Sequence, residues 1–194
     1  STNCSRSIIY RLDQNSGAVI DSVLLNHTII NDATINNSGL IVTGSKSNNI
    51  NGKQLLVQQF DSLLTSIWIC LYNNTLGNYM DEGNELKMSN NNIYVAGLSQ
   101  NSTSTYGVLA KINSLGNIQW SRKLVNGATS YDCISFDVDK ALDHCYVLTG
   151  QNRRLKYNPY GTRLFDKPIL DGVFASICTN ATSATPASLL MLAG

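Results

Sequence analysis

A short apolar run that ends in glycine occurs four times in this chain of 194 residues, as GLIVTG, YVAG, CYVLTG and LLMLAG. The final glycines of these runs are Gly44, Gly97, Gly150 and Gly194, which lie 53, 53 and 44 residues apart. Continuing from Gly194 through Ser1 back to Gly44 adds another 44 residues. A nearly fixed period of this length is typical of repeated supersecondary units. The spacing therefore predicts four repeats, the last of which is shared between the two ends of the chain.

Each repeat has the pattern of four short β-strands. The clearest one contains NELKMS and IYVAGLSQ around the turn NNN, followed by YGVLAKIN and IQWSRKLV around the turn SLGN. Apolar residues in these segments alternate with polar ones or form short β-rich runs, and Gly, Asn and Ser mark the turns. No segment shows helical periodicity, so the sequence predicts an all-β fold.

Four-stranded units with a period of 44–53 residues fit the blades of a β-propeller, whose twisted sheets pack face to face. We therefore predict a single domain over residues 1–194, a four-bladed β-propeller of four-stranded antiparallel blades. Its repeats cover roughly 26–77, 78–126 and 127–171, and the closing blade combines 172–194 with 1–25. In that blade, strands from both termini would share one sheet and close the ring.

Two other interpretations of the terminal segments remain open. The chain could be a segment of a longer propeller with more blades, cut at a repeat boundary. The end SATPASLLMLAG could be the tail of a lipid-anchor signal, although its apolar part is short for that and the repeat accounts for it.

Charge and hydropathy exclude two classes of partner. The net charge is +1, only 14% of residues are charged and no basic block occurs, so we expect no nucleic-acid binding. No apolar run approaches the roughly 18 residues that a membrane-spanning helix needs, so no membrane span is expected. The apolar fraction of 43% suits a globular domain with a real core.

Asparagine is unusually common, with 23 residues. It tolerates left-handed backbone and favours tight turns, which a chain of many hairpins requires. Six Asn-x-Ser/Thr sequons occur, at Asn3, Asn26, Asn36, Asn73, Asn101 and Asn180. They permit N-glycosylation in a secreted protein, although a chain so rich in Asn, Ser and Thr is expected to contain about that many by chance.

The five cysteines contain no C-x-x-C pair, and with only two histidines a zinc site of the usual spacing is not expected. In the predicted closing blade, Cys4 and Cys178 would lie at the same end of one sheet, where a disulfide would tie the termini together. Cys133 and Cys145 lie on the two arms of one hairpin and could pair across it if their Cα atoms come within roughly 7 Å. Cys70 would remain buried. These pairings favour an oxidising compartment.

Three aspartates, Asp32, Asp81 and Asp132, fall at similar points of successive repeats, near the start of the innermost predicted strand. There they would face one mouth of the central channel. A ring of carboxylates could hold a cation or water molecules, or each Asp could accept hydrogen bonds from backbone N–H groups at a blade junction. The second interpretation needs no ligand, so we predict no metal site.

Trp68 and Trp120 lie at equivalent points of the fourth predicted strand in adjacent repeats. They could stack on a sugar or pack between blades, and we favour packing. The loop DVDKALD, from Asp137 to Asp143, carries three carboxylates but lacks the central Gly and the closing Glu of an EF-hand. We interpret it as a solvated turn.

The order NNIYVAG and YGVLAKINSLGNIQW, with an Asp in the first strand, resembles the propeller repeat of bacterial cell-surface proteins. More loosely it is similar to the blades of quinoproteins. The resemblance is best over residues 78–125. It implies an extracellular, adhesive or scaffolding module without a particular activity.

No Gly-x-Ser-x-Gly, Walker or His-Glu-x-x-His motif occurs, so we predict neither an enzyme nor a bound cofactor. The sequence favours an extracellular or surface-exposed structural or protein-interaction module, in which the chain could be a protomer of a larger assembly. A carbohydrate-binding, lectin-type propeller is the alternative. Protein partners or self-assembly are expected, with glycans as the other class of ligand.

Overall fold

The computed structural model of the protein describes residues 5–48, 52–73, 79–101, 103–169, 174–180 and 188–193. Every regular element in these residues is a β-strand, so the all-β prediction is confirmed for this part of the chain. None of the described segments contains a helix that could cross a membrane.

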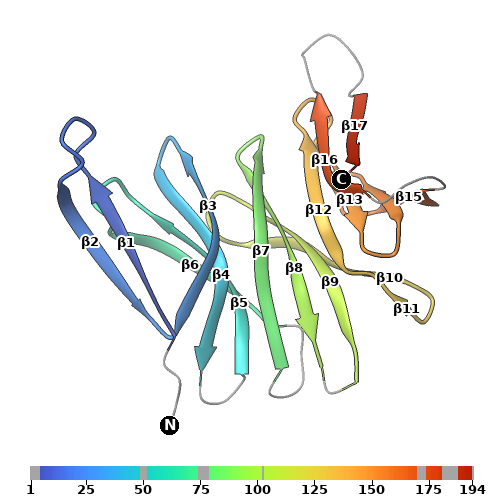
Figure 1. The fold of residues 1–194 in the computed structure, drawn as a ribbon, viewed down its shortest axis with the longest axis horizontal. Coiled ribbons are helices and arrows are strands. Elements are labelled where there is room, and N and C mark those ends of the chain that lie inside the picture. Colours follow the sequence, from blue (N-terminus) through green and yellow to red (C-terminus); the bar gives the residue numbers. More distant parts are fainter. Residues whose placement is uncertain are drawn as a thin grey trace.

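Three complete blades of four antiparallel strands follow one another along the chain (Figure 1). The first blade consists of β3 (Thr28–Asn36), β4 (Gly39–Asn48), β5 (Gly52–Phe60) and β6 (Ser66–Tyr72). The second consists of β7 (Tyr79–Ser89), β8 (Asn92–Gln100), β9 (Thr105–Ile112) and β10 (Ile118–Asn126), with β11 (Thr129–Ser130) added at the edge of β10. The third consists of β12 (Cys133–Asp139), β13 (His144–Thr149), β14 (Arg153–Tyr157) and β15 (Arg163–Pro168). A short parallel contact between β5 and β7 joins the first two blades at one corner.

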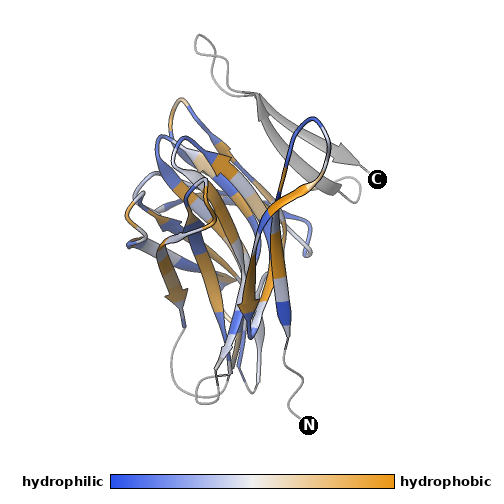
Figure 2. Ribbon diagram, turned by 90° about the vertical axis from the view of Figure 1, so that its left-hand side faces the viewer, coloured by the Kyte–Doolittle hydropathy of each residue, from blue (hydrophilic) through white to orange (hydrophobic). Residues whose placement is uncertain are grey.

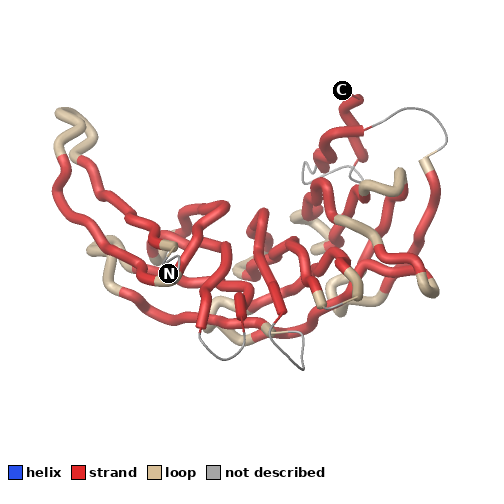
Figure 3. Tube along the Cα trace, turned by 60° about the horizontal axis from the view of Figure 1, so that its bottom comes forward, coloured by secondary structure: helices blue, strands red, loops and turns tan. Residues whose placement is uncertain are grey.

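Two hairpins flank the complete blades, each as a two-stranded sheet of its own. They are formed by β1 (Arg6–Leu12) with β2 (Val19–Asn26), and by β16 (Phe174–Asn180) with β17 (Ser188–Ala193). The inner strands β3, β7, β12 and β16 lie side by side, so the blades form an open crescent with one hairpin at each end (Figures 1 and 3).

The predicted closure of the ring by strands from both termini is not formed in this structure. Among the described strands, β1 pairs only with β2, and β17 pairs only with β16. Both contacts are local hairpins, which close short loops at little entropic cost. In this structure the two hairpins lie at opposite ends of the crescent (Figure 3), and they do not share one sheet.

The recurring glycine has a structural reason in the first two blades. The inner strand carries a β-bulge opposite Gly44 in β4 and opposite Gly97 in β8. A Cβ atom on either glycine would lie 1.9 Å from a backbone oxygen of the bulged strand, so a side chain cannot fit. In the third blade the bulge lies opposite Thr149 instead, and Gly150 falls just outside the strand. The third copy of the motif is therefore displaced by one residue.

Hydrophobic cores lie between successive blades. Ile41 and Leu55 of the first blade pack against Leu86 and Val95 of the second. The second interface has the same form and contains the apolar residues Tyr94, Leu109, Phe136, Val147 and Leu155. Because each complete blade is covered on both faces, residues 55–60 of β5 and 106–112 of β9 are all buried. The third strands of the first two blades are therefore buried without alternation, and their polar residues Gln58, Gln59 and Lys111 are buried with them.

The cysteine prediction is wrong for Cys133 and Cys145, which are free thiols. The register of the hairpin places Cys133 opposite Thr149 and Cys145 opposite Val138, so the two cysteines are five positions apart along the sheet. Burial raises the pKa of the Cys145 thiol well above its ordinary value. Cys70 is buried and free, as expected. Cys4 and the side chain of Cys178 lie outside the described residues.

Alkylation of the denatured, unreduced protein followed by peptide mapping is expected to find the alkyl group on both Cys133 and Cys145. In the native protein the same reagent should leave Cys145 unmodified, because its thiol is buried and protonated. Recovery of a disulfide-linked peptide containing both residues would contradict the register of β12 and β13.

Candidate functional site

A carboxylate on one inner strand joins each blade to the next. Asp32 Oδ2 on β3 accepts a hydrogen bond of 2.8 Å from the backbone N–H of Leu86 on β7, and its Oδ1 accepts one from Ala33. One blade further on, Glu85 Oε2 accepts a bond of 3.4 Å from the N–H of Phe136 on β12. Asp32 and Glu85 occupy the same position, directly after the bulge of their strand. The backbone-accepting interpretation is therefore confirmed for Asp32.

Asp81 and Asp132 do not repeat this arrangement. Asp81 is buried near the start of β7, opposite Ser99, whereas Asp132 is exposed before β12 and contacts the Gln151 side chain. The three predicted aspartates thus lie at unequal levels of the inner strands. Among the described residues no three His, Cys, Asp or Glu side chains are grouped so that they could hold a metal ion.

The inner strands border a polar cleft of about 470 Å³, lined in part by Asp32, Lys87, Asp137 and Lys140. Lys87 Nζ lies 2.9 Å from Glu85 Oε1. Burial alone would lower the pKa of Lys87, but the hydrogen bond and charge of Glu85, followed by Asp137 and Asp32, raise it. Acidic and basic groups compensate each other here, so the cleft has no strong preference for one sign of charge.

Replacing Asp32 by alanine is expected to destabilise the protein by about 1.5–3 kcal/mol, since the carboxylate accepts two backbone hydrogen bonds and one of them crosses between blades. Asp132→Ala is the matched control and should change stability by less than about 0.5 kcal/mol, because its side chain is exposed. Urea denaturation measures both. Equal effects would contradict the structural difference between the two aspartates.

The two tryptophans pack between blades, which confirms that interpretation. Trp68 Nε1 on β6 donates a hydrogen bond of 3.1 Å to the carbonyl of Ser114, in the turn between the third and fourth strands of the second blade. Trp120 Nε1 on β10 donates one of 2.9 Å to the carbonyl of Pro159, in the corresponding turn of the third blade. Both indoles are therefore engaged within the chain and are not free to stack on a sugar.

Each tryptophan ring also lies on a glycine of the turn that it contacts. Gly116 has φ +82 and Gly161 has φ +75, and a Cβ atom on either would lie 2.7 Å from the ring. An asparagine opens each turn: Asn113 accepts backbone N–H bonds from residues 115 and 117, and Asn158 from residues 160 and 162. The Asn-x-x-Gly turn thus provides a flat surface on which the indole ring packs.

In the β1–β2 hairpin an arginine, not a tryptophan, donates the hydrogen bond to the turn of the next blade. Arg11 Nη1 donates a hydrogen bond of 3.1 Å to the carbonyl of Ser62, in the turn of the first blade. Asp21, opposite Arg11 in the register, occupies the position of the tryptophan. With no indole ring above it, the turn of the first blade can carry Leu64 at φ 59, where the other turns have glycine.

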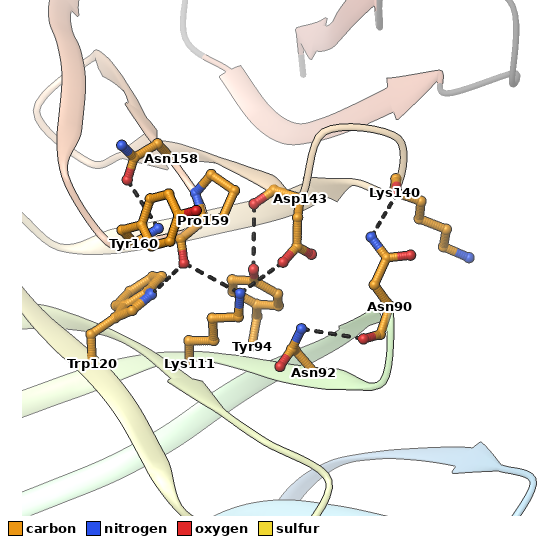
Figure 4. A network of polar contacts seen from close by, with 10 residues as sticks. All are labelled: Asn90, Asn92, Tyr94, Lys111, Trp120, Lys140, Asp143, Asn158, Pro159 and Tyr160. Carbon is orange, nitrogen blue, oxygen red and sulfur yellow. Dashed lines mark hydrogen bonds and ion pairs between the residues drawn. The ribbon is translucent and has the colours of Figure 1, made fainter.

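A buried ion pair completes the interface between the second and third blades (Figure 4). Lys111 Nζ lies 2.7 Å from Asp143 Oδ2 and 3.2 Å from the carbonyl oxygen of Pro159, and 5.2 Å from the centre of the Tyr94 ring. Tyr94 in turn donates a hydrogen bond to the Asp143 carbonyl. The loop containing Asp143 is therefore attached to the second blade and is not a solvated turn throughout.

Electrostatics hold Asp143 in its charged form. Burial would raise the pKa of its carboxyl, but the hydrogen bond and charge of Lys111, whose Nζ lies 2.7 Å from Oδ2, outweigh burial and lower it. Neighbouring Asn90 Nδ2 donates to the Lys140 carbonyl at the edge of the same interface (Figure 4). These polar side chains stabilise the contact between two blades.

An amide-rich cleft of about 480 Å³ lies beside this interface. Turns of successive blades contribute its polar lining, which includes Asn36, Asn37, Ser38, Asn90, Asn91 and Lys140. Side-chain amides offer both donors and acceptors, so the cleft can bind groups such as hydroxyls and peptide bonds. Sequence reasoning had assigned these residues to turns, and Asn36 also to a sequon, without predicting a shared cleft.

The β1–β2 hairpin carries an exposed apolar face. Its large apolar side chains that are about half exposed or more are Ile8, Tyr10, Leu12, Val19, Ile20 and Leu24. Figure 2 looks at the molecule from this side and shows the hydrophobic residues of the two strands. A groove of about 490 Å³ with a mainly apolar lining runs beside β1, bordered by Ile9, Tyr10, Ile35 and Leu40. Contiguous apolar surface of this kind marks interaction sites.

Sequence reasoning identified the strands of this hairpin but missed its open face. The signal was the alternation in SIIYRL, which places Ile8, Tyr10 and Leu12 on one face of the strand. It also missed Arg11 and Lys111, whose role depends on which turn of the next blade lies beside them.

No family model matches the sequence, and no curated protein matches it. Among solved structures, the chain is similar to the C-terminal WD40 domain of Sif2, with a TM-score of 0.47 and 15% identity. The similarity covers 77% of this chain and 41% of that one, so this chain spans less than half the length of that protein.

Proposed function

We propose that this chain is a non-catalytic β-propeller module, located outside the cell or at its surface, that binds other proteins and serves a structural role. Its prominent side chains, Trp68, Trp120, Asp32 and Lys111, bond to neighbouring blades. The residues available for a partner are those of the open turns and of the uncovered hairpin.

The exposed face of the β1–β2 hairpin carries this proposal. Ile8 is 50% exposed and Tyr10 56% exposed, in a strand whose counterparts β5 and β9 are buried throughout their centre. Burying apolar surface contributes roughly 25 cal/mol per Å², so this face gives a protein partner a substantial driving force. Aromatic and aliphatic side chains close together are also typical of the centre of protein interfaces.

Affinity capture with matched variants tests the proposal. The native chain, the double variant Ile8→Lys/Leu24→Lys and the control Tyr160→Lys are each presented to the extracellular and surface proteins of cells that make it. Tyr160 is 80% exposed in a turn of the third blade, remote from the hairpin. Proteins retained by the native chain and the control, but lost with the double variant, are the expected result. Identical retention by all three would contradict a role for this face.

Location outside the cell is supported by the sequons whose asparagines are accessible. Asn26 is exposed at the end of β2, and Asn101 is half-buried near the exposed Thr103. Deglycosylation of protein from its native source is expected to reduce its mass, with Asn26→Gln removing one glycan. An unchanged mass would remove this support while leaving the interaction proposal intact.

A lectin-type function is the second candidate, and the amide-rich cleft favours it. Asn37 and Asn91 line that cleft with Lys140 and could bond sugar hydroxyls. Binding on a glycan array that is lost in Asn37→Ala and Asn91→Gly would support it. Glycine suits the second site because Asn91 has φ 61. Absence of glycan binding by the native chain would exclude this candidate.

A further inference from the structure

The two ends of the crescent are complementary half-blades. The β1–β2 hairpin corresponds to the third and fourth strands of a blade, because its register and bulge repeat those of β9 and β10, with a turn that is one residue longer. The β16–β17 hairpin corresponds to the first and second strands, because β16 lies beside the inner strand β12 and carries the same bulge. Each end therefore has the two strands that the other end lacks.

The outer face of the β1–β2 hairpin is built to contact a preceding blade. Leu12 and Ile112 occupy the same position, directly before the residue that opens the turn. Ile112 is 1% exposed and belongs to the core shared with the preceding blade, whereas Leu12 is 54% exposed. The face that includes Leu12 is thus equivalent to a blade interface with its partner absent.

The turn of this hairpin likewise lacks the aromatic ring that packs on the turns of the second and third blades. Gly17 has φ +70, like Gly116 and Gly161, but a Cβ atom on Gly17 would have no heavy atom within 4 Å. In the other two turns an indole ring covers the glycine. The hairpin therefore has the glycine turn on which an aromatic ring can pack, but not the ring.

The opposite end of the crescent has the aromatic side chain, but not the glycine turn of a following blade. Phe165 lies opposite Lys156 on the third blade, as Trp120 lies opposite Lys111 on the second. Lys156 Nζ is 4.9 Å from the centre of the Tyr146 ring, which repeats the contact of Lys111 with Tyr94. The group of Tyr146, Lys156 and Phe165, here called the leading group, matches the group that binds the turn of a following blade.

The end of the crescent that carries the leading group and the β16–β17 hairpin is here called the leading end. We infer that the leading end of one copy docks onto the β1–β2 hairpin of a second copy. Strand β17 of the first copy then pairs with β1 of the second, and four strands from two chains form one composite blade. This inference rests on the proposed protein-interaction function and names its partner. In the docked pair Phe165 covers Gly17, and the apolar face containing Leu12 and Tyr10 is buried. In this structure the two ends of the crescent lie apart, so the contact is not made within one chain (Figure 3).

Pairing of β17 with β1 also satisfies both strand edges. An edge strand presents a row of backbone N–H and C=O groups that pair readily with another strand. The groove beside β1, bordered by Ile9, Tyr10 and Ile35, lies where the second strand of a complete blade would run. Head-to-tail contacts of this kind close into a ring when the rotation between copies allows it.

Mixing of two variants tests the inference. Tyr10→Lys/Leu12→Lys disables the hairpin end, and Phe165→Asp disables the leading end, with Lys156→Glu as a second variant in case Phe165→Asp does not fold. Alone, each is expected to dissociate at least about 30-fold more readily than the native chain, as substitutions at the centre of an interface do. Mixed in equal amounts, they should form a one-to-one complex, because one intact hairpin end and one intact leading end remain.

Sedimentation velocity measures the assembly, with Tyr160→Lys as the control that should assemble like the native chain. Hydrogen exchange should slow in residues 6–12 when the native chain assembles, and should not slow in the hairpin variant. Native protein that stays monomeric up to about 100 μM would overturn the inference. The inference would also be overturned if the hairpin variant did not assemble but Phe165→Asp assembled like the native chain. In that case the hairpin face binds by another contact, and the proposed function stands without this partner.

Discussion

Trp120→Ala is expected to destabilise the protein by about 3–5 kcal/mol, the usual cost of removing a large aromatic side chain from a core. Its ring contacts the Tyr94 ring edge-on at 6.0 Å and belongs to the core between the second and third blades. The substitution also leaves the Pro159 carbonyl without the indole donor. Thermal unfolding should show a fall in midpoint of about 2–4 °C for each kcal/mol.

A double-mutant cycle with Gly161 separates the ring contact from backbone strain. Gly161→Ala places a Cβ atom against the Trp120 ring at φ +75, so it should cost about 1–3 kcal/mol for the clash in addition to the strain. In the Trp120→Ala background only the strain remains. Gly127→Ala reports strain alone, because Gly127 has φ +59 and open space around it. Additive effects of the two substitutions would contradict the ring-on-glycine contact.

Lys111→Met is expected to cost about 3–5 kcal/mol, since it leaves the Asp143 carboxylate charged and partly desolvated without its cation. The side chains of this pair are only 8% and 13% exposed. Lys111→Met/Asp143→Asn should recover much of the loss, because neither charge then remains, and asparagine tolerates the left-handed backbone at this position.

The Arg11–Asp21 pair provides the control for exposure. Its atoms lie 3.8 Å apart and its side chains are 34% and 44% exposed, so Asp21→Asn should cost less than about 1 kcal/mol. A similarly small effect of Lys111→Met, measured by urea denaturation, would show that the blade interface does not depend on its buried ion pair.

The same pair determines part of the response to acid. The pKa of Asp143 is lowered in the folded protein from its ordinary value of 3.8, despite the opposing effect of burial. The unfolded carboxyl therefore takes up its proton at a higher pH than the folded one. The stabilisation is fully present well above pH 3.8 and is lost as the pH falls toward the lower pKa of the folded state. Lys111→Met should remove most of this loss of stability at acidic pH. If the free energy of unfolding of Lys111→Met fell with acid as steeply as that of the native protein, the pairing would be contradicted.

The candidate site could be predicted only in part from sequence. The accepting role of Asp32 and the packing of Trp68 and Trp120 followed from the kinds of contact these residues favour at a blade junction. The equivalence of Asp32 with Glu85, rather than with Asp81, was missed because the residue types differ, although the two positions are 53 residues apart like Gly44 and Gly97. The unpaired state of Cys133 and Cys145 likewise depends on which residues of β12 and β13 lie opposite each other.

Local patterns in the sequence were enough to determine the strands, their tight turns and their grouping into blades, since alternation, apolar runs and Asn-x-x-Gly turns act over a few residues. The recurring glycine also indicated the repeat. Only the tertiary structure decided how far the row of blades curves, because the curvature results from the packing of whole sheets. In this structure β1 and β17 lie apart, and the face that contains Leu12 is exposed at one end of the crescent. The apolar side chains of β1 that a closed ring would bury are therefore exposed in this structure.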